Sequence, residues 1–263
     1  MEYCSLMSGS WGNCHYIKGK TTSIIIDAGQ TGKRVLANLA QAGLGDGRDL
    51  AGILVTHAHR DHVTAVGVLA RKLKVPVYAT EGTWCQMEEI SGPIPDNLRR
   101  TVELEGKWRL NELEIQTFPT SHDALESVGY VVRCGSQGIG VATDMGVFTA
   151  RMAEALQSLE CLVLEANHDL DMLRLGRYPV YLKKRISGVS GHLSNEDAGA
   201  GLLRVLCPRT RHVVLAHLSE ENNTPEKALN CIGGLVAGYA GEKNPELKIL
   251  VAPRCTPGPR ILF

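Results

Sequence analysis

Short apolar runs alternate with amphipathic segments along the first third of the chain. The runs have the length of β-strands, and one longer segment follows the helical period and ends at a glycine. Strands are predicted over residues 14–19, 21–29, 51–57 and 76–80, the first two as a hairpin. Helices are predicted over residues 32–43, 61–73 and 80–90. This alternation of element types is typical of an α/β fold.

The rest of the chain repeats this order, beginning with a β-rich stretch. Strands are predicted over residues 107–110, 113–120, 127–135, 138–144, 161–167 and 211–219. Helices are predicted over residues 150–159, over residues 193–206 from Ser194 or Asn195, and from Thr224 onward. The simplest arrangement is two packed sheets covered by helices, a four-layer αββα sandwich in one domain over residues 1–263, although periodicity does not exclude another α/β fold.

Composition limits the partners and the location. The chain has 28 basic and 28 acidic residues among 263, so nucleic acid would have to bind a local basic patch. Its eight cysteines are scattered without a CxxC motif, which indicates reduced thiols. The first residues lack the features of a signal peptide, and no apolar run approaches the roughly 20 residues of a membrane span. We therefore expect a cytoplasmic protein without membrane contact, and the sequence indicates no obligate protein partner.

Four candidate metal ligands follow a predicted strand in the stretch ILVTHAHRDHV, residues 53–63. They are His57, His59, Asp61 and His62. Loops after strands are where α/β proteins place functional side chains. Imidazole with carboxylate suits zinc, manganese or iron, and the absence of cysteine from the stretch argues against a closed structural zinc site. The stretch therefore predicts an open, catalytic metal site.

Three further candidates, His122, Asp144 and His217, each follow an apolar run directly. Any one of them alone is explained as well by a residue that caps a turn. Their shared position after predicted strands indicates instead that several strand ends supply ligands to one site.

The stretch THAHRDH resembles the HxHxDH signature of metallo-β-lactamase-fold hydrolases, and the three later candidates follow the order of that family's remaining ligands. The resemblance implies two divalent metal ions, zinc or manganese. The ligands that it implies are His57, His59 and His122 on one ion, Asp61, His62 and His217 on the other, and Asp144 as a bridge. Asp27 is expected to support the histidine loop from behind. Two such ions lower the pKa of a shared water to near neutrality, and the hydroxide is then expected to attack phosphorus in line.

Longer segments narrow the resemblance. They are SGSWGN from Ser8, EANHDLDML from Glu165, RYPVYLKKRI from Arg177, GHLSNEDAG from Gly191 and LAHLSEENNTPE from Leu215. Together they resemble the YycJ/WalJ-type subfamily, with Ala166 at a position where serine is more usual. The resemblance implies an exonuclease that degrades nucleic acid from the 5′ end, with DNA as substrate rather than RNA.

A basic cluster lies between two of these segments. Its members are Arg174, Arg177, Lys183, Lys184 and Arg185. We expect the last three to bind a phosphate backbone next to the metal ions. A solvated surface stretch with Tyr178 and Tyr181 packed inward explains the same residues equally well.

His168 and His192 are candidate catalytic residues together with Asp61, because both stand in polar segments after strands or turns. Either imidazole could bind the scissile phosphate or protonate the leaving 3′ oxygen. A hydrogen bond that orients a loop is the structural alternative, and it is stronger for His168. Asn167 and Ser194 are expected to add hydrogen bonds to phosphate, whereas the SGSWGN turn is expected to support the site.

Other functions remain open at this stage. A small-molecule phosphodiesterase or a thioester hydrolase could use the same fold, because fold does not determine substrate. A non-catalytic binding module in which metal only braces loops is a different class, and retention of the full ligand set argues against it. A metal-dependent nuclease, in its simplest form a 5′→3′ exonuclease on DNA, is the leading hypothesis.

Overall fold

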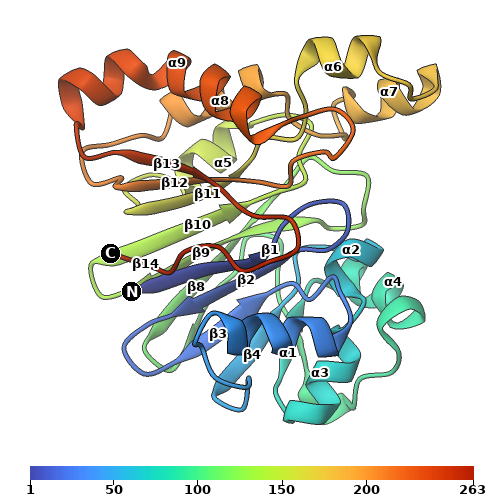
Figure 1. The fold of residues 1–263 in the computed structure, drawn as a ribbon. Coiled ribbons are helices and arrows are strands. Elements are labelled where there is room, and N and C mark those ends of the chain that lie inside the picture. The colour runs from blue at the N-terminus through green and yellow to red at the C-terminus, as the bar shows by residue number, and fades with distance from the viewer.

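The computed structural model describes residues 1–263 as two seven-stranded sheets packed face to face, with helices on both outer faces (Figure 1). An apolar core fills the space between the sheets, and a further core lies between each sheet and its helices. The helices at the bottom of Figure 1 cover the first sheet, and those at the top cover the second. The predicted four-layer αββα sandwich is confirmed.

The first sheet combines the N-terminal third of the chain with its last residues. Its strands in spatial order are β14 (Ile261–Leu262), β1 (Glu2–Met7), β2 (Cys14–Lys18), β3 (Ser23–Ile26), β4 (Leu50–Leu54), β5 (Val77–Ala79) and β6 (Arg99–Thr101). The helices of this half are α1 (Gly32–Gln41), α2 (Arg60–Val63), α3 (Val66–Leu73) and α4 (Glu81–Ser91). β2 and β3 form the predicted antiparallel hairpin, and β3 to β6 run parallel.

The second sheet comes from the remainder of the chain. Its strands in spatial order are β13 (Lys248–Val251), β12 (His212–Ala216), β11 (Cys161–Glu165), β10 (Gln137–Ala142), β9 (Val128–Cys134), β8 (Leu113–Pro119) and β7 (Lys107–Leu110). The helices of this half are α5 (Ala150–Ala155), α6 (Leu170–Leu175), α7 (Val180–Ile186), α8 (Asn195–Leu203) and α9 (Pro225–Lys243). β7 to β10 are antiparallel neighbours, and β10 to β13 run parallel.

The strand directions explain why distant residues meet. β8, β10, β11 and β12 all point the same way, because β8 and β10 are each antiparallel to β9 while β10 to β12 are parallel. Their carboxyl ends therefore open onto one edge of the second sheet. His122, Asp144, Glu165 and His217 stand at or just beyond those ends. The ends of β3 and β4 bring Asp27 and the histidine loop to the same edge.

One predicted helix is divided in two. The segment expected as a single helix over residues 61–73 forms α2 and α3, separated at Thr64 and Ala65. The reason is a tertiary contact, because Ala28 N–H donates to the carbonyl of His62 while Ala65 N–H donates to the carbonyl of Ala28. These two bonds replace helical ones and attach the histidine loop to the end of β3.

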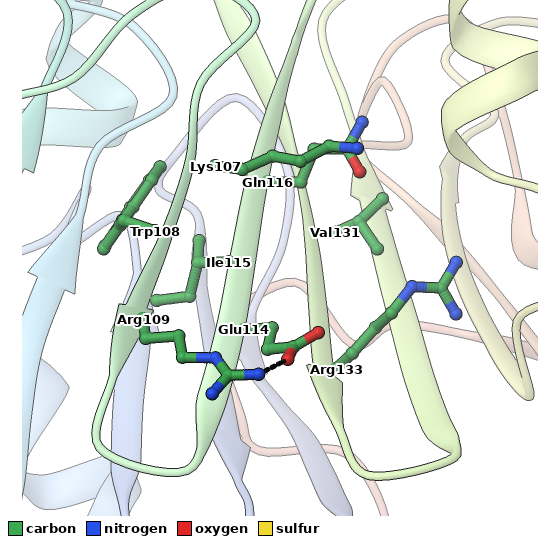
Figure 2. A pocket seen from close by; sticks show the side chains of 8 residues that line it. All are labelled: Lys107, Trp108, Arg109, Glu114, Ile115, Gln116, Val131 and Arg133. Atoms are coloured by element: carbon green, nitrogen blue, oxygen red, sulfur yellow. Dashed lines mark hydrogen bonds and ion pairs between the residues drawn. The ribbon is translucent and has the colours of Figure 1, made fainter.

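The outer face of the second sheet is exposed at its β7–β8–β9 corner. A hollow of about 360 Å³ lies there, and its walls include Lys107, Gln116 and Arg133, as Figure 2 shows. Arg109 and Glu114 form an ion pair across its floor. The hollow lies near the beginning of β8, whereas His122 follows the end of that strand, so it is separate from the edge that collects the candidate ligands.

Candidate metal centre

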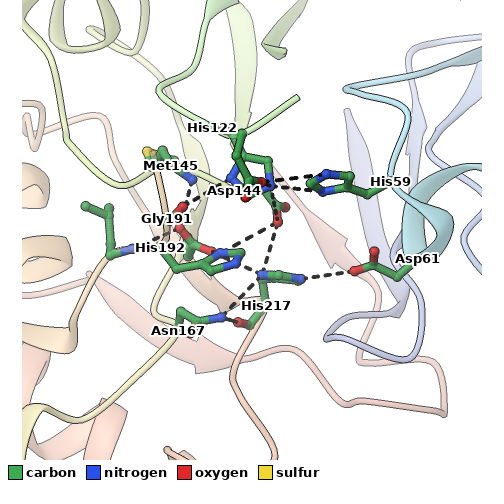
Figure 3. Close-up of polar contacts among 12 residues, drawn as sticks. His59, Asp61, His122, Asp144, Met145, Asn167, Gly191, His192 and His217 are labelled. Atoms are coloured by element: carbon green, nitrogen blue, oxygen red, sulfur yellow. Dashed lines mark hydrogen bonds and ion pairs between the residues drawn. The ribbon is translucent and has the colours of Figure 1, made fainter. Parts of the chain in front are cut away.

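The seven predicted ligands converge at the edge where the strands end (Figure 3). Three groups of candidate ligand atoms have every member within 4.8 Å of the others. The groups are His57, His59 and His122; Asp61, His62 and His217; and His57, His62 and Asp144. Asp144 lies between the first two groups, with Oδ2 3.3 Å from His62 Nε2 and Oδ1 3.7 Å from His122 Nε2. This arrangement has the geometry of two adjacent cation sites that share one carboxylate.

The backbone at three strand ends is held in the left-handed region. Asp27, Asp144 and His217 have φ angles of 62°, 59° and 54°. Non-glycine residues adopt this conformation rarely, with aspartate and histidine among the more tolerant, and it concentrates at functional sites. The turn aims each side chain away from its strand and into the cluster.

Asp27 fixes the histidine loop from behind. Its carboxylate accepts hydrogen bonds of 2.8 Å from the Thr56 backbone N–H, the Thr56 hydroxyl and His62 Nδ1. Because Nδ1 of His62 is occupied in this way, Nε2 is the nitrogen that faces the cluster. This is the supporting role predicted for Asp27, and it sets the orientation of a buried imidazole.

Gly29 allows the end of β3 to lie against the histidine loop. A Cβ atom at this position would stand 1.6 Å from the carbonyl oxygen of Asp61. No side chain fits at that distance, so the loop requires glycine here for its close backbone contact.

The SGSWGN turn supports the cluster, as the sequence suggested. Ser8 Oγ accepts a 2.8 Å hydrogen bond from the His217 N–H. Asn13 is fully buried, and its Nδ2 lies 3.3 Å from Asp61 Oδ2 and 3.0 Å from His62 Nε2. The turn thus connects residues of both sheets to the same side of the cluster.

Glu165 is a site residue that the sequence analysis quoted but gave no role. Its buried carboxylate contacts His192 Nδ1 at 2.7 Å and His217 Nδ1 at 3.0 Å, and it accepts the N–H groups of Met145 and Leu193. With Asp144, His192 and His217 it forms a fourth group of atoms within 4.8 Å of one another. The signal was present, because Glu165 ends an apolar strand in the same way as the residues that were singled out.

The protonation equilibria indicate a site with an excess of buried negative charge. Burial opposes ionisation of Asp144, but His217 and His62 outweigh it and hold the carboxyl pKa well below its usual range. Burial likewise opposes a charge on His217, yet Asp144, Asp61 and Glu165 raise its pKa to about 10. In the absence of other cations these two imidazoles carry the charge that balances the carboxylates. Divalent ions would supply it directly.

The other histidines are suited to bind metal. Burial and repulsion from His62 hold the pKa of His57 well below its usual value, so its imidazole is neutral, as a ligand must be. Buried His57 Nε2 and Asp144 Oδ2 have no hydrogen-bond partner. Unpaired polar atoms of this kind are costly in a protein interior, and a bound cation would satisfy both. The residues present therefore fit the two divalent ions that the sequence implied.

The structure separates the remaining predicted residues. His192 lies in the cluster, with its side chain 18% exposed beside Glu165. Asn167 Nδ2 donates to the His217 carbonyl at 3.0 Å and thereby supports a candidate ligand. His168 is buried outside the four groups with Nδ1 unpaired, and the Ser194 hydroxyl caps α8 through the Asp197 N–H. The last two are not brought to the open side of the cluster.

The predicted phosphate-binding residues lie on α7. Lys183 Nζ donates to the Arg174 carbonyl at 2.8 Å, and Lys184 is exposed. Arg185 Nε pairs with Asp123 Oδ2 at 2.6 Å. Asp123, which the sequence analysis did not single out, places Oδ1 3.6 Å from His59 Nε2 and so connects α7 with the cluster.

Comparisons with known proteins agree with this geometry. Residues 22–218 match the model of the beta-lactamase superfamily domain. The chain is 40% identical over 228 residues to exodeoxyribonuclease YycJ of Bacillus anthracis, which covers 87% of this chain and 86% of the relative. It is 38% identical over 229 residues to exodeoxyribonuclease WalJ of Streptococcus pneumoniae, covering 86% and 85%. This protein belongs to the YycJ/WalJ family of metallo-β-lactamase-fold proteins. As a member, it is a metal-dependent hydrolase whose His and Asp groups are of the dinuclear type found in the superfamily.

Solved structures support the fold of this YycJ/WalJ-family protein. The metallo-β-lactamase fold protein YhfI of Bacillus subtilis superposes with a TM-score of 0.72 at 14% identity, covering 98% of both chains. The short form of human tRNase Z gives 0.66 at 15% identity and the same coverage. At these identities the likeness extends to the fold alone. No helix of the structure has the length and apolar character needed to cross a membrane.

Proposed function

We propose that this protein is a metal-dependent exodeoxyribonuclease that hydrolyses the phosphodiester bonds of DNA in the 5′→3′ direction. The observation that carries the proposal is the convergence of seven candidate ligands at one sheet edge in a chain 40% identical to a protein named exodeoxyribonuclease. Two zinc or manganese ions are the proposed cofactors.

The chain's own residues have distinct parts in this reaction. His57, His59 and His122 would hold one ion, Asp61, His62 and His217 the other, and Asp144 both. Bound divalent ions activate a water for attack on phosphorus and stabilise the charge that the phosphate oxygens gain. Asp27 and Asn167 hold His62 and His217 in position, so the ligand geometry is set before substrate binds.

His192 is the proposed general acid. Its Nδ1 donates to Glu165 across 2.7 Å, which leaves Nε2 to face the open side of the cluster. The Glu165 carboxylate stabilises the imidazolium form, because His192 and His217 outweigh burial and lower the pKa of Glu165 to about 2. The imidazolium gives its proton to the leaving 3′ oxygen as the phosphorus–oxygen bond breaks, a contribution of about 10² to 10⁴ in rate.

A cleavage assay with end-labelled substrates tests the proposal. Purified protein supplied with manganese or zinc should shorten 5′-phosphorylated DNA from its 5′ end and release mononucleotides. His59→Ala and Asp61→Ala forms should bind less metal and leave the DNA intact. RNA, bis-p-nitrophenyl phosphate and thioesters are assayed in parallel, because a nuclease should strongly prefer the polymer. The proposal fails if the metal-loaded protein digests no nucleic acid or prefers a small ester.

A further inference from the structure

The segment of residues 170–187, called the arm here, projects beside the metal centre. It contains α6 and α7, which extend beyond the sheets at the upper right of Figure 1. Leu173 of α6 is buried, whereas α7 has no buried residue. A helix that buries nothing gains little from the protein core, so its side chains are available for a partner.

The arm is nevertheless docked onto the cluster at its C-terminal end. Arg185 pairs with Asp123, and the carbonyl of Gly191 lies 3.1 Å from Nδ1 of His122. A Cβ at Gly191 would approach the Arg185 and Ile186 carbonyls to 2.2 Å, so the backbones touch there. The end of α7 is therefore fixed at the mouth of the site.

Tyr181 lies one turn before Arg185 on the same side of α7, because residues four apart on a helix are neighbours. Its side chain is 75% exposed, and the ring stacks on no other aromatic residue. The inward-packed tyrosine that the sequence allowed is thus contradicted at this position. An exposed aromatic ring on a helix that leads to a phosphodiesterase site is a surface on which a base can stack.

Charge separates the two sides of the site. The arm contains five basic residues and one acidic residue in a chain whose formal charge is zero. On the other side, Trp11 donates from Nε1 to Glu220 at 2.6 Å, and Glu221 follows in an exposed position. A phosphate backbone is attracted to the arm and repelled by the acidic side.

We propose that the arm binds an unpaired stretch of DNA strand, with Tyr181 stacking on a base and Lys184 and Arg185 contacting the adjacent phosphates. The inference rests on the proposed nuclease function and adds a substrate feature to it. Bases inside a duplex are already stacked on both faces, so an exposed ring can stack only on an unpaired or terminal base. The enzyme should therefore favour single-stranded or frayed 5′ ends over blunt duplex.

The test measures binding without cleavage, by fluorescence anisotropy of the full-length protein in chelator. Probes are a labelled 12-nucleotide single strand, the same strand with abasic sites, and a blunt duplex. The wild-type protein should bind the normal strand most tightly. Tyr181→Ala should weaken that binding about tenfold, Tyr181→Phe should retain it, and Tyr181→Ala should have little effect on the abasic strand. Val68→Ala, at another exposed apolar position on α3, should bind like wild type.

Several outcomes would overturn the arm proposal. Equal affinity of wild type and Tyr181→Ala for the normal strand would show that no base stacks there, and equal loss on the abasic strand would show a structural role only. A change of Tyr181→Ala from dimer to monomer with unchanged DNA affinity would assign the arm to contacts between copies. In each case cleavage of DNA by metal-loaded wild type would leave the nuclease function standing, whereas absence of cleavage would remove both.

Discussion

The metal centre is almost wholly buried, whereas the arm beside it exposes most of its side chains. In the centre, Asp27, His62 and Asp144 lie in the protein interior, and each is positioned by the end of a strand or by hydrogen bonds from the loops between strands. In the arm, Tyr181 and Lys184 face solvent without a partner. Hydrolysis requires atoms fixed to within a fraction of an ångström, and strand ends of a packed sandwich provide this. Recognition of a flexible strand tolerates mobile, charged side chains.

This contrast predicts that changes in the centre affect turnover and metal content, and that changes in the arm affect affinity and its salt dependence.

The largest effect is expected from Asp144→Asn. The amide keeps the shape of the side chain but removes the anionic charge between the two groups of candidate ligands. Hydrolysis should fall by about 10³-fold or more, since several kcal/mol of transition-state stabilisation depend on the metal site. Metal analysis of the purified variant should show reduced occupancy. Full occupancy with normal turnover would separate Asp144 from the metal site.

Gly29→Ala should damage the centre without touching a ligand. The added methyl group would collide with the Asp61 carbonyl, and overpacking of this kind typically costs about 1–3 kcal/mol or more. We expect a lower unfolding temperature and reduced metal occupancy. The matched control is Gly234→Ala in α9, where a Cβ meets nothing within 4 Å. That change should stabilise the helix by about 0.5–1 kcal/mol and leave activity unchanged.

Glu165→Gln should have an intermediate effect. The carboxylate that orients His192 and His217 becomes an amide of the same shape, so turnover or metal affinity should fall by about 10- to 100-fold. Glu160→Gln is the control, because Glu160 lies at the opposite end of β11 and bonds to Gly138 N–H and Arg209. Steady-state kinetics that show equal loss in both variants would remove the special role of Glu165.

Charge removal from the arm should have the smallest effect. In Arg177→Ala/Lys184→Ala, the KM for single-stranded DNA should rise several-fold while metal content and kcat stay close to wild type. If both side chains contact phosphates, the slope of log affinity against log salt should flatten by about 1.4. Lys107→Ala/Arg109→Ala removes the same charge from the hollow on the second sheet (Figure 2) and should change neither quantity. An equal change in both double variants would indicate a nonspecific charge effect.

Much of the fold could be predicted because its strands are locally distinct. The β2–β3 hairpin and the apolar runs of β10, β11 and β12 were recognised from alternation and length. β1 and β14 were missed, since EYCSLM mixes polar and apolar residues and the two-residue β14 exists only by pairing with Glu2 and Tyr3. α6 and α7 were also missed, because their apolar residues do not form one buried stripe.

The sequence by itself determined the chemical types in the centre, because an imidazole or carboxylate after an apolar run is visible without knowing its neighbours. It thereby predicted His57 to His62, His122, Asp144 and His217 as ligands. Only the tertiary structure decided that Glu165 joins them, that Gly29 must lack a side chain, and that Tyr181 faces solvent beside the site. Those properties depend on contacts between segments up to about two hundred residues apart, as between Ser8 and His217, and local sequence does not contain them.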